Sequence, residues 1–164
     1  MPGQALAGLR VIDFTWVGVG PLLTKYMADF GAEVIRIESR THLDSFRFAP
    51  PFVENTPGIE RSGYFLNLNT SKSHVTLNLH HPQGRALACR LIAQADVVAE
   101  NFTSHVMEQW HMTYDDLRQV KPDLVMISLS MEGRTGPHRH ALGFGTVLQA
   151  AAGLAHLTGW PDRP

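Results

Sequence analysis

Two glycines and one acidic residue have a spacing that occurs in dinucleotide-binding sites. Gly18 and Gly20 begin a G-x-G-x-x-G pattern, and Glu38 lies near the ~20-residue spacing of an acid that binds a nicotinamide ribose. However, the third glycine position holds Leu23, and Pro21 removes a backbone N–H that would face a pyrophosphate. The motif is therefore incomplete. In the alternative interpretation, the glycines form only a tight turn and Glu38 is a solvated strand end.

Histidines and one cysteine could also carry chemistry. The nine histidines include the pairs His80–His81 and His138–His140. Zinc needs three or four convergent ligands, and no cysteine or carboxylate stands at ligand spacing beside either pair, so we predict no metal site. Cys89 lies among apolar residues, which favours a packed, inert thiol over a nucleophile. As the only cysteine, it excludes an internal disulfide and predicts a reducing compartment, the cytoplasm.

Polar and charged residues at predicted strand ends could bind a phosphorylated ligand. Asn101 and Phe102 follow an apolar run, and an amide beside an aromatic ring can hold a nucleobase or a pantetheine-like chain. Arg36, Arg40 and Lys72 lie near other loop ends and could bind phosphates. Alternatively, these cations are ordinary surface residues and Phe102 covers the core. From the residues alone, we predict a domain that binds a phosphorylated cofactor.

The stretch that must position these residues predicts a βαβ unit. It contains a strand at residues 10–14, a helix at 22–30 and a strand at 33–37. The helix would place large apolar side chains on one side, namely Leu23, Tyr26, Met27 and Phe30. Gly31 follows, where a left-handed residue ends a helix. Ligands bind at the carboxyl ends of parallel strands, so the Thr15–Pro21 loop is the first candidate. Asp13 could orient this loop by accepting N–H bonds, with catalysis as its alternative role.

The rest of the chain continues the alternation of strands and helices. Further strands are predicted at residues 74–79, 95–99 and 124–129, and helices at 64–69, 82–94, 105–110, 113–121 and 144–157. The 82–94 helix is expected to point four residues inward, namely Leu87, Ala88, Leu91 and Ile92. Residues 39–62 form a long connection over the sheet. We therefore predict an α/β fold, a Rossmann-like open parallel sheet with helices on both faces, as one domain over residues 1–164.

The size and charge of the chain limit its partners. Among 164 residues, 14 are lysine or arginine and 15 are aspartate or glutamate, so no net charge attracts nucleic acid or an anionic membrane. We see no secretory leader and no apolar run long enough to span a bilayer, so we predict neither nucleic-acid nor membrane binding. The chain ends in a turn, Gly159–Pro164, and we expect a fragment of a larger protein.

Six short motifs follow one another along the chain. They are LRVIDFT at residues 9–15 leading to Gly20-Pro21; MADFGAEVI at 27–35 with Glu38; Leu66-Asn67 with Lys72; Leu77 and Leu79 before Pro82 and Gly84; ADVV at 95–98 with Glu100-Asn101-Phe102; and GRTGP at 133–137. Their order resembles the amino-terminal portion of the class III CoA-transferase family, the group of formyl-CoA and carnitine CoA-transferases. The resemblance covers nearly the whole chain.

The resemblance implies a Rossmann-like domain that binds coenzyme A as a substrate thioester, without a metal, in a homodimer or heterodimer of interlocked chains. By analogy, CoA would contact three loops, through Val17, Gly18 and Val19, through Leu77, Asn78, Leu79 and His80, and through Asn101, Phe102 and Thr103. Arg40 and Lys72 are the candidate phosphate ligands. The resemblance also implies an acyl-CoA donor and a carboxylic acid acceptor. An aspartate attacks the donor thioester, giving an acyl anhydride and then an aspartyl-CoA thioester.

Several departures from the family pattern leave alternatives open. The family's nucleophilic aspartate lies a little beyond the last turn, so we assign no catalytic residue in this chain and expect the fragment alone to be inactive. Ser39 and Gln109 stand where basic residues are common, and Gly145 stands where an acid usually follows Phe144. These changes would suit a non-catalytic CoA-binding subunit of a heteromeric transferase. Gly143-Phe144-Gly145 lacks the histidine of α-methylacyl-CoA racemases, so a racemase, like an NAD-dependent oxidoreductase, ranks lower.

Overall fold

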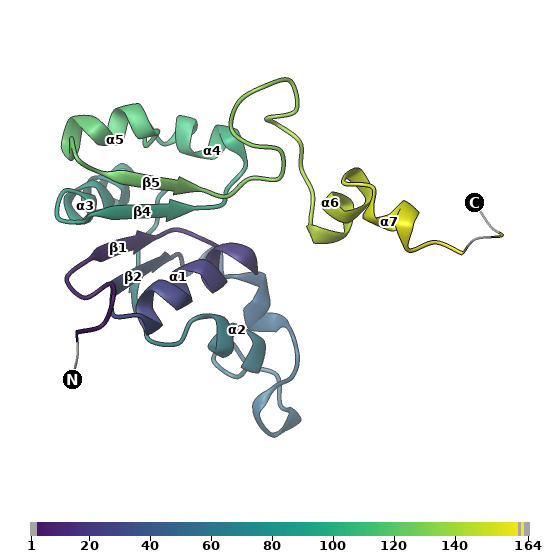
Figure 1. Ribbon diagram of the computed structural model, residues 1–164. Helices are drawn as coiled ribbons and strands as arrows, with labels where there is room; N and C mark the ends of the chain where they lie inside the picture. Colours follow the sequence, from purple (N-terminus) through teal and green to yellow (C-terminus); the bar gives the residue numbers. More distant parts are fainter. Residues whose placement is uncertain (1–2, 161, 163–164) are drawn as a thin grey trace. The chain divides into compact units, whose positions relative to one another are not determined.

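The chain divides after Leu129 into two units in the computed structural model, which describes residues 3–160 and 162. The first unit contains a five-stranded sheet with its helices. The second unit contains α6 (Gly145–Ala151) and α7 (Leu154–Leu157). Both units can be followed in Figure 1. None of the helices in the described residues combines the length and apolar character needed to cross a bilayer.

All five strands of the sheet run parallel, in the order β3-β2-β1-β4-β5. They are β1 (Arg10–Asp13), β2 (Glu33–Glu38), β3 (Ser73–Thr76), β4 (Val97–Glu100) and β5 (Val125–Ser128). The chain builds outward from β1 on one side and from β4 on the other, so the strand order reverses between these two strands. Loops that leave β1 and β4 therefore diverge and open a crevice. The predicted Rossmann-like α/β fold is confirmed.

The helices of the first unit begin and end at recognisable signals. They are α1 (Val19–Asp29), α2 (Gly63–Leu68), α3 (Pro82–Ile92), α4 (Ser104–Gln109) and α5 (Tyr114–Val120), with short 3-10 helices η1 (Ser45–Phe48) and η2 (Val53–Asn55). The side chains of Thr113 and Asp116 form a reciprocal capping box at α5. Gly31 follows α1 with φ +105°, as predicted, because a residue with a Cβ rarely adopts this conformation.

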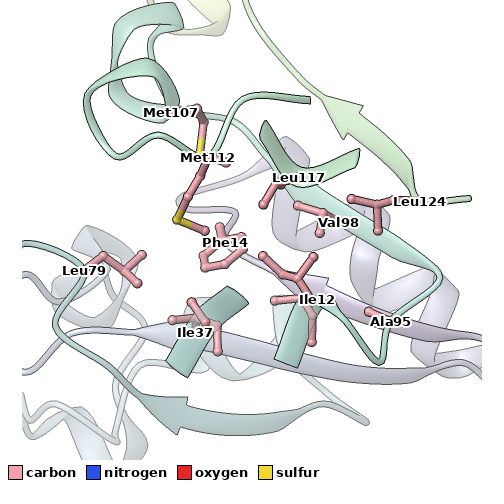
Figure 2. Packing of buried hydrophobic residues seen from close by; sticks show 12 residues of the cluster. Ile12, Phe14, Ile37, Leu79, Ala95, Val98, Met107, Met112, Leu117 and Leu124 are labelled. Atoms are coloured by element: carbon pink, nitrogen blue, oxygen red, sulfur yellow. The ribbon is translucent and has the colours of Figure 1, made fainter. Parts of the chain in front are cut away.

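Helices cover the sheet on both faces. Successive strand residues point to opposite sides, so Val11 lies in one apolar cluster and its neighbour Ile12 lies in the other. Val11 packs with Ala28 of α1, while Ile12 packs in the larger cluster that Figure 2 shows. That cluster contains Ile12, Phe14, Ile37, Leu79, Ala88, Ile92, Ala95, Val98, Met107, Met112, Leu117 and Leu124. It joins α3, α4 and α5 to the sheet.

Small residues of α1 face the sheet. The buried residues of this helix are Gly20, Pro21, Thr24 and Ala28. Two members of the predicted apolar side, Tyr26 and Phe30, are 54% and 57% exposed. The pattern of large apolar residues therefore did not identify the buried side. Because small side chains allow a close approach, the helix can lie directly against the strands.

Other elements also differ from the prediction in their bounds. β3 ends at Thr76 rather than at Leu79, and a turn leads into α3. Gly84 of α3 lies against this turn, where a Cβ would overlap the carbonyl oxygen of Asn78. Leu87 of α3 is exposed instead of facing inward. The predicted helix over residues 144–157 is broken into α6 and α7, because Gly153 has a φ of +80°.

Candidate functional site

A pocket of about 220 Å³ opens where β1, β2 and β4 end, beside the turn that follows β3. Its apolar lining consists of Phe14, Trp16, Ile37, Leu77, Leu79, Phe102, Val106 and Trp110. Its polar lining consists of Glu38, Ser39, His42, His80 and Gln109. This strand-end pocket therefore lies at the point where the strand order reverses, which is where open parallel sheets bind their ligands.

Aromatic rings form much of the wall of the strand-end pocket. The ring centroid of Phe102 lies 6.4 Å from that of Trp16 and 5.3 Å from that of Trp110. His80 meets Trp110 edge to face at 5.9 Å, and the ring of His42 lies 5.4 Å from that of His80. Aromatic walls with a few polar groups suit a flat base or a narrow apolar chain.

The loop after β1 is tied to the end of β4 by one side chain. Asn101 accepts a hydrogen bond from the N–H of Trp16 at 2.7 Å and donates one to the carbonyl oxygen of Trp16 at 2.8 Å. The next residue, Val17, donates its N–H to the Asp44 carboxylate at 3.0 Å and has a φ of +66°. A β-branched residue is strained in this left-handed region. Asn101 and Asp44 therefore hold the loop in a conformation that its own sequence disfavours.

A buried ion pair also supports the loop after β1. The Lys72 ammonium lies 3.1 Å from the Asp13 carboxylate, and both side chains are fully buried. Lys72 also donates to the carbonyl oxygen of Pro21, while Asp13 accepts the N–H of Thr15 and the hydroxyl of Thr24. Burial lowers the pKa of Lys72 to about 8, although the nearby Asp13 carboxylate acts in the opposite direction. Asp13 thus orients the loop, which is the first of the two roles predicted for it.

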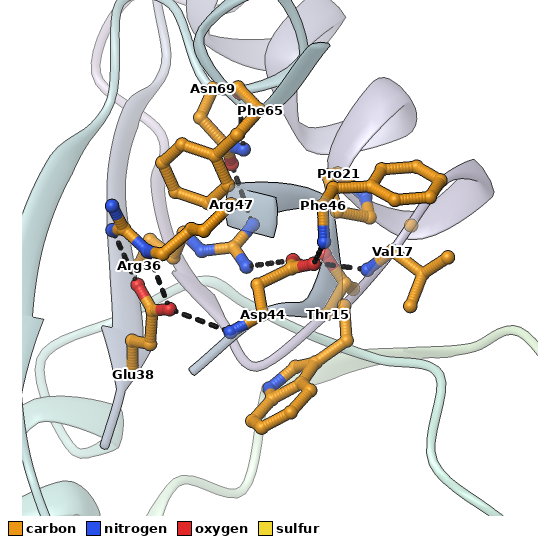
Figure 3. Close-up of polar contacts among 12 residues, drawn as sticks. Thr15, Val17, Pro21, Arg36, Glu38, Asp44, Phe46, Arg47, Phe65 and Asn69 are labelled. Atoms are coloured by element: carbon orange, nitrogen blue, oxygen red, sulfur yellow. Dashed lines mark hydrogen bonds and ion pairs between the residues drawn. The ribbon is translucent and has the colours of Figure 1, made fainter. Parts of the chain in front are cut away.

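Arg36 of β2 and Arg47 of the long connection are both paired with carboxylates, as Figure 3 shows. Arg36 donates to Asp44 and to Asn69, both at 2.6 Å. Arg47 donates to both carboxylate oxygens of Glu38, at 2.8 and 2.7 Å. Burial would raise the pKa of Glu38, but the hydrogen bonds from Arg47 and from the Asp44 N–H outweigh it and hold that pKa below its ordinary value.

Glu38 therefore differs from both of its predicted states. It is 7% exposed, so it is not a solvated strand end. Its carboxylate oxygens accept three hydrogen bonds from Arg47 and Asp44, which leaves it poorly placed to bind a ribose. The sequence could not reveal this, because Arg47 lies in a connection without regular periodicity.

Comparison with known proteins decides the family. The family model described as CoA-transferase family III matches residues 6–164. The chain belongs to CoA-transferase family III. The family resemblance predicted from the motifs is confirmed.

Relatives within CoA-transferase family III align along almost the whole chain. Acetyl-CoA:oxalate CoA-transferase of Acetobacter aceti is 38% identical over 163 residues, which are 99% of this chain and 41% of that protein. The β subunit of succinyl-CoA–L-malate CoA-transferase of Chloroflexus aurantiacus is 36% identical over 95% of this chain and 38% of its own length. A crystal structure of a CAIB/BAIF family protein from Brucella suis has a TM-score of 0.88 at 35% identity, over 98% of this chain and 42% of that chain. The chain thus spans about two fifths of these relatives.

Within this family III chain, four of the predicted CoA-binding residues line the strand-end pocket. They are Leu77, Leu79, His80 and Phe102. Asn101 acts on the pocket indirectly, through Trp16. The other predicted residues lie outside the lining, namely Val17, Gly18, Val19, Arg40, Lys72, Asn78 and Thr103. Lys72 is turned into the buried ion pair with Asp13, whereas Arg40 is exposed.

Several pocket residues were missed by the sequence analysis, among them Trp16, His42 and Trp110. Trp16 had a usable signal, because it is an aromatic residue in a loop directly after a strand. His42 and Trp110 had none, since they come from the long connection and from the end of α4. The described residues also contain no group of three or more histidine, cysteine, aspartate or glutamate side chains arranged to hold a metal ion.

Proposed function

We propose that this protein is a CoA-transferase that moves CoA between carboxylic acids and binds CoA in the strand-end pocket. The observation that carries the proposal is the position of this pocket, at the carboxyl ends of β1 and β4 in a family III chain. Its aromatic wall suits the adenine ring or the pantetheine chain. The loop after β1, tied to Asn101 and Asp44, contributes Trp16 to the lining.

The proposed mechanism uses an aspartate that lies beyond residue 164. Its carboxylate attacks the carbonyl carbon of the acyl-CoA donor, and the CoA thiolate leaves to give an enzyme acyl anhydride. The thiolate then attacks the aspartyl carbonyl, releasing the donor acid and forming an aspartyl-CoA thioester. The acceptor carboxylate attacks the aspartyl carbonyl and displaces the CoA thiolate, which gives a second anhydride. The thiolate then attacks the acceptor's carbonyl carbon in this anhydride, forming the new acyl-CoA and releasing the aspartate carboxylate. The oxyanions formed in these steps need preorganised hydrogen-bond donors.

A non-catalytic subunit of a heteromeric transferase remains the second candidate. One specific observation favours it, because a relative that aligns with 95% of this chain is named as a β subunit. Expression of the whole gene product with affinity purification would separate the two candidates. One polypeptide with turnover supports the first, whereas activity only with a second polypeptide supports the second.

Interlocked chains are the proposed assembly. In the second unit, large apolar side chains are exposed, with Phe144 at 75%, Leu157 at 81% and Trp160 at 74%. Such side chains are usually covered by protein, and a second chain or the remainder of this protein would cover them.

The proposed compartment is the cytoplasm. The reason is that Cys89 is a free thiol, which suits a reducing compartment.

Calorimetric titration tests the proposed ligand. CoA should bind to the chain and NAD⁺ should not, because Glu38 is already bonded to Arg47. Phe102→Ala should weaken CoA binding by removing the ring between Trp16 and Trp110. Leu87→Ala provides a matched control, since this exposed apolar residue lies on α3 outside the lining. Failure of CoA to bind to the folded parent protein would refute the proposal.

A further inference from the structure

The two residues that flank Trp16 in the loop after β1 are both held by buried carboxylates. Thr15 donates its N–H to Asp13 at 2.8 Å, and Val17 donates its N–H to Asp44 at 3.0 Å. Asp13 ends β1, whereas Asp44 belongs to the connection after β2, so the two carboxylates come from different parts of the chain. Because Trp16 lines the strand-end pocket, the relative position of these carboxylates decides where this part of the lining lies.

Each of these carboxylates is paired with a buried cation. Nζ of Lys72 lies 3.1 Å from Oδ2 of Asp13. Nη2 of Arg36 lies 2.6 Å from Oδ2 of Asp44. All four side chains are at most 1% exposed. Since an unpaired buried charge is very costly, each cation should move together with its carboxylate.

A single amide oxygen joins the two ion pairs. Oδ1 of Asn69, the C-cap residue of α2, accepts a hydrogen bond from Nη1 of Arg36 at 2.6 Å (Figure 3) and another from Nζ of Lys72 at 3.0 Å. Nδ2 of Asn69 donates to the carbonyl oxygen of Phe65 at 2.9 Å, which orients the amide with its oxygen toward the two cations. Nε of Arg36 is buried and has no hydrogen-bond partner among the described residues, so loss of the Asn69 oxygen would leave a second donor of Arg36 unpaired.

An asparagine has suitable chemistry for this bridge. The buried groups around it already balance three cations against three carboxylates, namely Arg36, Arg47 and Lys72 against Asp13, Glu38 and Asp44. A neutral oxygen can accept from two cations without adding a charge that burial would penalise. An apolar side chain at this position would leave both donors unpaired, because Asn69 itself is only 8% exposed.

We propose that Asn69 is a positioning residue, which acts through the two ion pairs to hold Trp16 in the lining of the strand-end pocket. Hydrogen bonds run from one end of the loop to the other in an unbroken series, through Thr15, Asp13, Lys72, Asn69, Arg36, Asp44 and Val17. Both ends of the series lie on the loop after β1, one on each side of Trp16, so a displacement of the bridge would reach both. The effect on ligand affinity rests on the proposed CoA function, whereas the position of Trp16 does not.

Fluorine NMR of the protein labelled with 5-fluorotryptophan tests the position of Trp16, with Trp→Phe variants to assign the resonances. Burial lowers the pKa of Lys72 to about 8, so the spectra are recorded at pH 7, where its ammonium is charged. Asn69→Ala should shift or broaden the Trp16 resonance and leave that of Trp160, in the second unit, unchanged. Asn69→Asp keeps an acceptor for both cations and should return the Trp16 resonance toward its parent position. Asn67→Ala is the matched control, since it removes an exposed asparagine from the same helix.

Calorimetry measures the consequence for ligand binding. Asn69→Ala should weaken CoA binding about fivefold, which is the factor that one net hydrogen bond contributes, and Asn69→Asp should recover part of the loss. If CoA does not bind to the parent protein, the proposed function fails, and the Trp16 resonance still tests the positioning role. A shifted Trp16 resonance with the parent's CoA affinity would refute the pocket as the CoA site and support the positioning role.

Two results would overturn the positioning role of Asn69. The first is an unchanged Trp16 resonance in folded Asn69→Ala, because Asn69 would then only stabilise the end of α2. The second is an equal shift in Asn69→Asp and Asn69→Ala, because the acceptor oxygen would then not be the cause.

Hydrogen exchange of the parent protein decides the question if Asn69→Ala does not fold. The N–H groups of Thr15 and Val17 should be protected equally, because they belong to one series of bonds that opens as a unit. Protection factors that differ by about tenfold or more would show that the two carboxylates hold the loop independently, which would overturn the role of Asn69.

Discussion

Replacing Asn101 should release the loop that forms one side of the strand-end pocket. The Asn101 amide makes two hydrogen bonds to the backbone of Trp16, at 2.7 and 2.8 Å. Each such bond contributes about 1 kcal/mol, so Asn101→Ala should lower the free energy of unfolding by about 2 kcal/mol. For a chain of this size, that corresponds to a fall in Tm of about 4–8 °C, measured by differential scanning fluorimetry.

The effect of Asn101→Ala on CoA binding follows from the strain at Val17. A non-glycine residue at φ +66° costs on the order of 1–3 kcal/mol, and the remaining bond to Asp44 offsets about 1 kcal/mol of it. The open loop would then be favoured by about 0–2 kcal/mol, and the apparent Kd for CoA should rise about two- to thirtyfold. Calorimetric titration with CoA measures this change.

A second background tests whether strain is the cause. Val17→Gly removes the side chain that disfavours the left-handed conformation, so the loop should stay closed without the amide. Asn101→Ala should therefore weaken CoA binding much less in the Val17→Gly background than in the parent. Equal losses in both backgrounds would refute this reasoning and would indicate that the Asn101 amide contacts the ligand directly. Asn101→Asp is a useful intermediate, because it keeps the acceptor for the Trp16 N–H and loses the donor.

Three further predictions concern the supports of the site. Lys72→Met should lower the free energy of unfolding in urea by about 3–5 kcal/mol, because it leaves the Asp13 carboxylate buried without its ion-pair partner. Adding Asp13→Asn to this variant should recover part of the loss. Additive losses in the double variant would contradict the ion-pair explanation. The folded-state pKa of Glu38 lies below its ordinary 4.5, so its ionised form stabilises the fold above that pH and the contribution is lost as the pH falls through the lowered value. Glu38→Gln should therefore make acid unfolding monitored by circular dichroism less steep than in the parent, and an unchanged acid limb would argue against the Arg47 pair. Gly84→Ala should lower Tm, because the added Cβ would overlap the backbone carbonyl of Asn78. Leu87→Ala on the same helix should leave Tm unchanged, because Leu87 is exposed. Similar Tm values for both variants would contradict a close approach of α3 to the turn before it.

Local sequence signals were sufficient for most of the fold. Apolar strands, the capping box at Thr113 and the turn glycine Gly31 act through neighbours in the chain, so their effects can be recognised without tertiary structure. The exposed side of α1 shows the limit of this approach. Which side of a helix is buried depends on how close the sheet lies, and in this protein Gly20 and Ala28 face it while the large Tyr26 and Phe30 do not.

By itself, the sequence determined the parallel α/β architecture and the family, and it predicted a ligand site at the ends of β1, β3 and β4. Only the tertiary structure decided how the charges around that site are used. Lys72 and Glu38 looked like ligand-binding groups in the sequence, but each lies in a buried pair with a residue far away in the chain or in an irregular connection. Burial makes an unpaired charge very costly, so the fold neutralised these groups. Spacing along the chain cannot reveal such pairs, because they form only when the loops meet in space.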